Sequence, residues 1–188
     1  MNKAVFLDRD GTINVEKHYL YKIEEFEYLP GALAGLKLLQ SLGYLLVIIT
    51  NQSGIGRGYY KEEDFKVLNE WMLKDLENKR IHINKVYYCP HHPDAQIERY
   101  RISCTCRKPA LGMYEKAIED FNIDLSQSWA IGDSIRDCAI CEKTKCKGFL
   151  IGNHERTDII NNVINNMYFN VKYALNLEDA SKIIASER

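Results

Sequence analysis

Apolar residues fall into short runs that alternate with longer stretches of helical periodicity. The clearest run, 44–50, is apolar nearly throughout, as expected of a strand covered on both faces. The clearest helical stretch, 61–78, carries apolar residues three and four positions apart. The same criteria predict further strands at 3–7, 83–88, 128–131, 148–151 and, within the tail 161–188, at 171–175. They predict further helices at 30–43, at 110–121, between the strands 128–131 and 148–151, and at the end of the tail.

Strands that alternate with helices indicate a parallel sheet with helices on both faces. The fold class we predict is α/β, a doubly wound, Rossmann-like sheet. The pattern contains no linker, repeat or low-complexity segment, so we expect a single domain over 1–188. The intervals 10–50 and 51–108 hold too few elements for a large separate cap domain.

Composition and charge limit the classes of partner. The chain has 46% hydrophobic and 27% charged residues and a formal net charge of −1, so it has no overall basic field that would attract nucleic acid or a membrane surface. No apolar run approaches the roughly 18 residues of a membrane span, and the first residues do not resemble a signal peptide. We therefore expect a cytoplasmic monomer without nucleic-acid or membrane partners.

Four residues of two metal-ligating types, cysteine and histidine, gather in the one long stretch that lacks periodicity. Three thiols and one imidazole make a closed tetrahedral set of the kind that holds structural zinc, whereas a catalytic zinc keeps one position open. A bound zinc would order the loop 89–106. His92 competes with His91 as the ligand, and unrelated reduced thiols are the plainer alternative. The zinc ligands we predict are Cys89, His91, Cys104 and Cys106.

Three further cysteines, Cys138, Cys141 and Cys146, lie on or beside a predicted helix with no histidine nearby. We expect them to serve as small apolar packing residues.

Two aspartates, Asp8 and Asp10, follow the first predicted strand. Ligands bind at the carboxyl ends of strands in open α/β sheets, so both side chains should lie at a site. One carboxylate can attack phosphorus as a nucleophile, and the other can donate and later accept a proton. The plainer alternative is a turn after a strand, with Gly11 supplying the bend.

Three other segments lie at comparable positions. Thr50 to Gly54 offers a hydroxyl and the backbone amides of a turn for phosphate oxygens. Lys108 precedes a helix and could neutralise the charge of a phosphoryl group. Asp133 follows another strand and could hold Mg²⁺ together with Asp8.

In order and position, the four segments resemble the motifs of the haloacid dehalogenase (HAD) superfamily. The resemblance implies that Asp8 is the nucleophile and Asp10 the general acid and base. It implies that Thr50 and Lys108 hold the phosphoryl group, and that Asp133 completes a Mg²⁺ site with Asp8 and the backbone carbonyl of Asp10.

Within the superfamily, the chain is most similar to the D-glycero-D-manno-heptose 1,7-bisphosphate 7-phosphatases, in the segments 6–14, 50–58, 87–93 and 104–109. The resemblance implies removal of the 7-phosphate. Ser134 departs from the pattern, since these enzymes often carry a lysine there, so the cation expected beside the phosphate is missing. The implied substrate-binding residues are Glu16, Lys17, His18, Tyr19, Asn51, Gln52, Ser53, Arg107 and Ser134.

Three alternatives remain open at this stage. Histidinol-phosphate phosphatases share the aspartates and the zinc loop, although the run 53–58 favours the heptose branch. A zinc-stabilised domain could bind phosphorylated partners or nucleic acid without turnover, but such a domain would not need both aspartates. A polynucleotide 3′-phosphatase shares the first motif, but the modest charge disfavours it.

Overall fold

The centre of the protein is a six-stranded parallel sheet, shown by a computed structural model that describes residues 1–152 and 170–187. The strand order is β3-β2-β1-β4-β5-β6, and every neighbouring pair is parallel. The predicted α/β class is confirmed. The strands are β1 (Ala4–Leu7), β2 (Leu45–Asn51), β3 (Lys85–Cys89), β4 (Trp129–Gly132), β5 (Lys147–Ile151) and β6 (Val171–Ala174).

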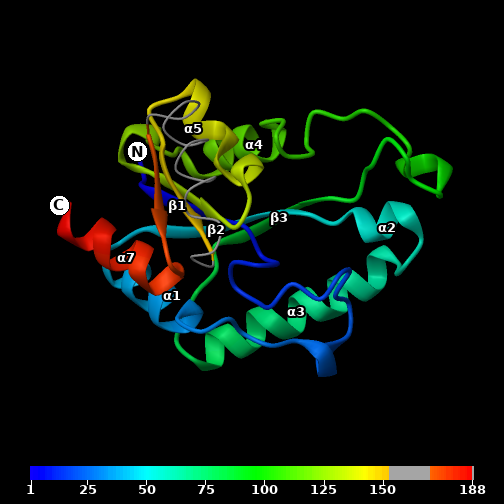
Figure 1. Ribbon diagram of the computed structural model, residues 1–188, viewed down its shortest axis with the longest axis horizontal. Helices are drawn as coiled ribbons and strands as arrows, with labels where there is room; N and C mark the ends of the chain where they lie inside the picture. Colours follow the sequence, from blue (N-terminus) through cyan, green and yellow to red (C-terminus); the bar gives the residue numbers. More distant parts are fainter. Residues whose placement is uncertain (153–169, 188) are drawn as a thin grey trace.

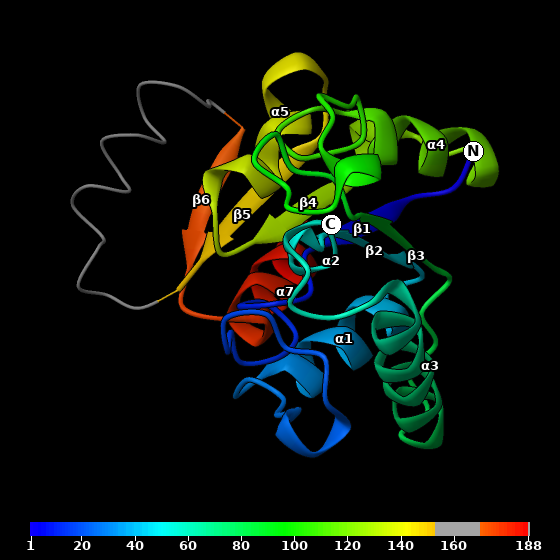
Figure 2. The same ribbon diagram turned by 90° about the vertical axis from the view of Figure 1, so that its right-hand side faces the viewer.

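Helices cover both faces of the sheet, which makes it doubly wound (Figures 1 and 2). Helices α1, α3 and α7 pack on one face, and α4 and α5 pack on the other. The α-helices are α1 (Ala32–Ser41), α2 (Ser53–Arg57), α3 (Glu62–Asn78), α4 (Gly112–Phe121), α5 (Ala139–Lys143) and α7 (Leu177–Ser186). Short 3-10 turns are η1 (Ile23–Glu25), η2 (Glu98–Tyr100), η3 (Leu125–Gln127) and η4 (Ile135–Cys138).

Strand β1 lies between β2 and β4 and is buried along its whole length. Val5 and Leu7 point into the core on the α1 side, whereas Ala4 and Phe6 point into the core on the α4 side. A strand apolar on both sides can occupy only the interior of such a sheet. The residues that follow β1 are therefore placed at the middle of the carboxyl edge.

The helices follow the sequence expectations with two differences. We expected a phosphate-binding turn at 50–54, but from Ser53 the segment continues as the short helix α2. The sequence did not indicate this helix because it contains Gly54 and Gly56, and glycine has poor helix propensity. The helix expected between β4 and β5 is split into the turn η4 and the five-residue α5. The 161–169 part of the tail and residue 188 lie outside the described residues.

The three cysteines that we expected to be packing residues are buried in the core on the α4 side, at Cys138, Cys141 and Cys146. Over 1–152 and 170–187, no helix has both the length and the apolar character needed to cross a bilayer.

Candidate active site

Four carboxylate-bearing or hydroxyl-bearing side chains meet at the carboxyl edge of the sheet. Asp8 and Asp10 follow β1, Thr50 lies near the end of β2, and Asp133 follows β4. Ligand oxygens of Asp8, Asp133 and Asp137 all lie within 4.8 Å of one another. Three carboxylates so close together repel one another, and a cation held among them relieves that repulsion.

Lys108 supplies one positive charge to this cluster from a buried position, with 2% of its surface exposed. Its Nζ lies 3.0 Å from Asp8 Oδ1 and 2.7 Å from Asp137 Oδ1, and donates to the Ile49 carbonyl at 2.6 Å. Burial alone would lower the pKa of Lys108, but the two carboxylates outweigh it and raise the pKa. The lysine is therefore held as a cation beside Asp8.

The backbone of Lys108 is fixed by an amide side chain from the neighbouring strand. Asn51 at the end of β2 accepts a hydrogen bond from the Lys108 N–H and donates one to the Lys108 carbonyl, each at 3.1 Å. Lys108 comes from a loop and not from the sheet, so this reciprocal pair sets the position of the loop relative to β2. The predicted substrate residue Asn51 thus also positions a predicted catalytic residue.

The carboxyls of Asp8 and Asp133 both hold protons unusually strongly. Burial raises the pKa of Asp8 to about 7, with Asp137 adding to the effect and Lys108 opposing it. Burial raises the pKa of Asp133 to about 6, again with a contribution from Asp137. Hard carboxylate oxygens with excess negative charge suit Mg²⁺, which takes such ligands.

Asp10 is in the opposite electrostatic situation. Burial would raise its pKa, but the Arg9 guanidinium and hydrogen bonds from Asn14 and Gln52 lower it. Arg9 Nη2 lies 2.9 Å from both Asp10 carboxylate oxygens, and the Asn14 and Gln52 amides each donate to Asp10 at 2.9 Å. The two aspartates that follow β1 therefore have pKa values shifted in opposite directions, which is the pattern expected of two carboxyls with different roles.

A buried chain of hydrogen bonds fixes the amide of Gln52. The Tyr60 hydroxyl donates to Gln52 Oε1 at 2.6 Å, and Gln52 Nε2 donates at 2.9 Å both to Thr50 Oγ1 and to Asp10 Oδ2. Gly54 permits this arrangement, because a Cβ there would lie 2.2 Å from Tyr60 Cε1 and 2.9 Å from Tyr19 Cδ1.

A cavity of about 350 Å³ opens beside Asp10 and Asp133. Most of the predicted substrate residues line it: Glu16, His18, Tyr19, Asn51, Gln52, Ser53 and Arg107. His18 and Tyr19 both have positive φ, of 50° and 74°, and such backbone strain tends to occur at functional sites.

Two of the predicted substrate residues, Lys17 and Ser134, do not line the cavity. Lys17 Nζ donates to the Glu25 carbonyl at 2.8 Å and pairs with Glu27 at 3.3 Å. Ser134 caps the turn η4, and its N–H donates to Asp137 Oδ2 at 2.9 Å.

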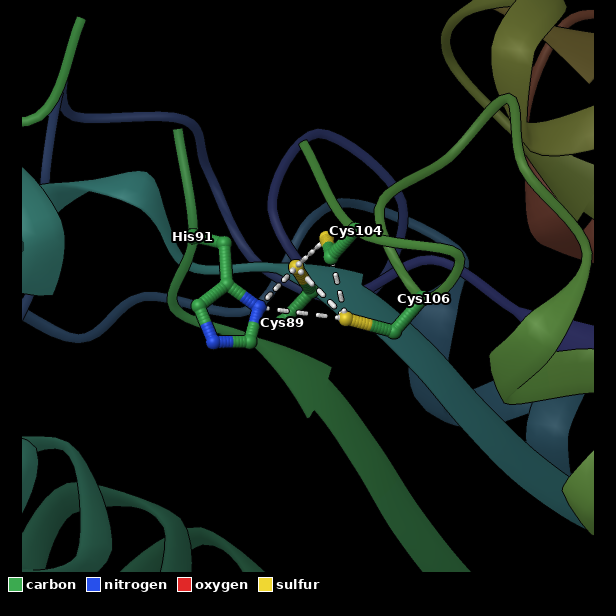
Figure 3. A group of neighbouring side chains, drawn as sticks. All are labelled: Cys89, His91, Cys104 and Cys106. Carbon is green, nitrogen blue, oxygen red and sulfur yellow. Dashed lines mark hydrogen bonds between the residues drawn. The ribbon is translucent and has the colours of Figure 1, made fainter. Parts of the chain in front are cut away.

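The predicted zinc ligands form a compact cluster at the start and end of the long loop (Figure 3). The three sulfur-to-sulfur distances are 3.1, 3.2 and 3.5 Å. His91 Nδ1 lies 3.6 Å from the Cys89 sulfur and 3.3 Å from the Cys106 sulfur. Three sulfurs and one imidazole nitrogen facing one another are a donor set that fits zinc with no position left for a water.

The competing histidine points elsewhere. His92 Nε2 lies 3.0 Å from Arg57 Nη2, and its Nδ1 accepts from the Asp94 N–H at 3.0 Å. His91 is therefore the histidine of the cluster. Its backbone carbonyl also accepts from Arg107 Nη1 at 3.2 Å, so the cluster is tied directly to a residue that lines the cavity.

Sequence reasoning assigned no role to three residues of the site. Among the ion pairs of Lys108, the one with Asp137 is the shortest, at 2.7 Å. Tyr60 orients Gln52, and Arg136 lines the cavity. Arg136 and Asp137 lie three and four residues after Asp133, and this proximity is the sequence feature that could have indicated a role for them. No sequence feature indicates a role for Tyr60, because only the fold brings its hydroxyl to Gln52.

Comparisons with known proteins agree with this geometry. Residues 3–171 match the family model described as polynucleotide kinase 3 phosphatase. The chain is 48% identical over 146 residues to the D-glycero-beta-D-manno-heptose-1,7-bisphosphate 7-phosphatase of Haemophilus ducreyi, over 77% of this chain and 80% of the relative. It is 46% identical over 135 residues to a Photorhabdus laumondii relative named for the alpha anomer, over 72% of this chain and 74% of the relative.

A solved structure is similar over nearly its whole length. It is a D,D-heptose 1,7-bisphosphate phosphatase from B. bronchiseptica in complex with magnesium and phosphate, with a TM-score of 0.83, 28% identity and 99% coverage of both chains.

The matches and the carboxylate edge together define a phosphatase of the HAD class. Within that class, the chain belongs to the family of heptose-1,7-bisphosphate 7-phosphatases, because identities of 42% to 48% extend over most of its length.

Proposed function

We propose that the protein removes the 7-phosphate of D-glycero-D-manno-heptose 1,7-bisphosphate through an aspartyl-phosphate on Asp8. The observation that carries the proposal is the Asp8 carboxylate, which lies at the mid-edge of the sheet with Lys108 Nζ 3.0 Å away. The cavity beside it has room for a sugar phosphate, and relatives up to 48% identical are named for this reaction.

The two aspartates have different roles in the reaction. An Asp8 oxygen attacks phosphorus, the bond from phosphorus to the sugar oxygen breaks, and Asp10 gives that oxygen a proton. Asp10 then takes a proton from the water that attacks the aspartyl-phosphate, which releases inorganic phosphate and restores Asp8. The Arg9 contact favours the ionised Asp10 needed in the second step. A bound anionic phosphate favours the protonated form needed in the first.

Several groups of this chain hold the phosphoryl group during both steps. Lys108 neutralises part of its charge, and Thr50 donates a hydrogen bond from the end of β2. The amides at the start of α2, with the side chains of Asn51, Gln52 and Ser53, complete the set of donors. Glu16, His18, Tyr19 and Arg107 line the part of the cavity that would receive the sugar.

The proposed enzyme binds two metal ions, a catalytic Mg²⁺ and a structural zinc. Asp8, Asp133 and the Asp10 carbonyl would hold Mg²⁺, which neutralises charge on the phosphate when bound. Cys89, His91, Cys104 and Cys106 would hold a structural zinc that orders the loop leading to Arg107 and Lys108. We further propose that the enzyme is a cytoplasmic monomer that needs no nucleic acid or membrane.

The test is phosphate release, in Mg²⁺, from the alpha and beta anomers of the heptose bisphosphate, with histidinol phosphate as the competing substrate. We expect a clear preference for a heptose bisphosphate, and no turnover by Asp8→Asn protein with an unchanged circular dichroism spectrum. A preference for histidinol phosphate would retain the phosphatase chemistry and refute the substrate. Turnover by Asp8→Asn would refute the covalent intermediate.

A further inference from the structure

The loop that carries the predicted zinc ligands is attached to the rest of the protein at a second place, away from the cluster of sulfurs and imidazole. The attachment is the carboxylate of Glu62, the first residue of α3. Its Oε1 accepts a hydrogen bond from the Tyr88 hydroxyl, and its Oε2 accepts one from the Tyr100 hydroxyl at 2.7 Å. None of these three residues lines the cavity, so the contact has no direct part in the proposed chemistry.

The two tyrosines belong to different halves of the zinc cluster. Tyr88 lies in β3 immediately before Cys89, whereas Tyr100 lies in η2 on the way to Cys104. The single carboxylate of Glu62 therefore connects the strand that carries the first ligand to the part of the loop that leads to the third. This connection brings the two halves of the cluster toward each other without using the metal.

Tyr100 is well placed to fix the middle of the loop. Its side chain is 7% exposed and lies in a buried cluster with Ile55 of α2 and Phe65 of α3. Its backbone carbonyl accepts a hydrogen bond from the His92 N–H at 3.1 Å. The position of Tyr100 thus constrains the backbone directly beside the ligand His91.

The carboxylate of Glu62 is a strong acceptor for both hydroxyls. The hydrogen bonds from Tyr88 and Tyr100 lower the pKa of Glu62, so the group is ionised at neutral pH. Hydrogen bonds to an ionised oxygen are stronger than those to a neutral one. The ion pair of Glu62 with Lys66 is longer, at 3.8 Å, and the lysine is 54% exposed, so this pair contributes little.

We propose that Glu62 is a positioning residue that orders the loop for zinc by holding Tyr88 and Tyr100 together. Zinc binding must order the chain between His91 and Cys104, and a loop that is already fixed at Tyr100 loses less conformational entropy when the metal binds. Removal of the carboxylate should therefore weaken zinc binding although every zinc ligand is kept. The inference rests on the zinc site of the proposed function.

The test measures zinc affinity by competition with a chromophoric chelator. Glu62→Ala removes both acceptor oxygens, and we expect the affinity to fall by about tenfold, which corresponds to one or two ordinary hydrogen bonds. Glu63→Ala is the matched control, because it removes the same charge from the same first turn of α3, where its side chain is exposed. Lys66→Ala removes only the longer ion pair. Both controls should bind zinc as the wild type does.

Two more variants make the result specific to this contact. Glu62→Gln keeps one acceptor oxygen and should recover part of the affinity. Tyr100→Phe keeps the buried ring, removes only the hydroxyl, and should lower the affinity by about threefold. In the Glu62→Ala background the same change should have almost no effect, because its hydrogen bond is already lost. Effects that multiply in the double variant would contradict the inference.

The outcomes separate this inference from the proposed zinc site. If Glu62→Ala bound zinc as tightly as Glu63→Ala, the role of Glu62 would be refuted and the zinc site would stand. A wild-type protein that took up no zinc would refute the site itself, and with it the inference.

Discussion

The hydroxyl of Tyr60 offers a clean test of how the site is held together. It donates to Gln52 Oε1 at 2.6 Å, and the tyrosine and glutamine are only 5% and 2% exposed. Burial raises the pKa of Tyr60 far above its ordinary value, so the hydroxyl remains a donor at all working pH values. Tyr60→Phe removes this donor and little else.

The expected cost in stability follows from the partner that is left behind. Gln52 Oε1 would stay buried without its donor, and such a loss costs about 1 to 3 kcal/mol of unfolding free energy. We expect about 2 kcal/mol, which for a chain of this size lowers the Tm by about 4 to 8 °C. Tyr59→Phe is the matched control, since Tyr59 is 58% exposed and should lose almost nothing.

The same substitution should slow catalysis through Asp10. Gln52 Nε2 donates to Asp10 Oδ2, and a glutamine that loses its tyrosine can turn away, whereas Arg9 and Asn14 still hold Asp10. We expect kcat to fall about three- to tenfold, well below the 10²- to 10⁴-fold contribution of a complete acid and base. Urea denaturation and steady-state kinetics measure the two effects. If Tyr60→Phe matched Tyr59→Phe in both, the chain from Tyr60 to Asp10 would have no energetic role.

Three further predictions concern the metals and the packing of α2. Mg²⁺ must displace protons from Asp8 and Asp133, whose pKa values are about 7 and 6. Its affinity, measured by calorimetry, should therefore rise with pH by up to about tenfold per unit for each proton displaced and level off above these pKa values; a flat profile would contradict this. Cys104→Ser should lower zinc content from near one per chain and also lower kcat, because the loop carries Lys108; full zinc content would refute the ligand assignment. Gly54→Ala should cost stability and activity, since a Cβ at 54 would lie 2.2 Å from Tyr60 Cε1; a thermal melt that matches the wild type would contradict the close packing.

The order of strands and helices could be predicted because the sheet is buried on both faces. A strand such as β2, apolar nearly throughout, has no other stable place in a domain of this size. The same pattern predicts that Asp8, Asp10 and Asp133 lie at one edge of the sheet, because each follows a strand of a parallel sheet. The helix α2 was missed because its five residues include two glycines, which the fold needs for close packing: a Cβ at Gly56 would lie 2.6 Å from the Pro90 carbonyl oxygen.

Residues that act through long-range contacts could not be predicted from local pattern. In the sequence, nothing distinguishes Tyr60 from the other tyrosines, and only the fold places its hydroxyl beside Gln52. Lys17 lies in the segment that lines the cavity, yet its side chain turns to Glu25 and Glu27. Sequence spacing identifies which segment reaches a site, whereas the direction of each side chain depends on partners that are distant in sequence.

Charge balance at the sheet edge connects the roles of the site residues. Asp8, Asp133 and Asp137 carry up to three negative charges within 4.8 Å, against the buried charge of Lys108 and the more distant, half-exposed charge of Arg136. Protons offset part of the excess, which is why the pKa values of Asp8 and Asp133 are raised. A dianionic phosphate entering such a site would meet net repulsion at neutral pH. Asp137 holds Lys108 beside Asp8, the nucleophile that we propose, and the excess negative charge that results favours a divalent cation at the site when phosphate binds.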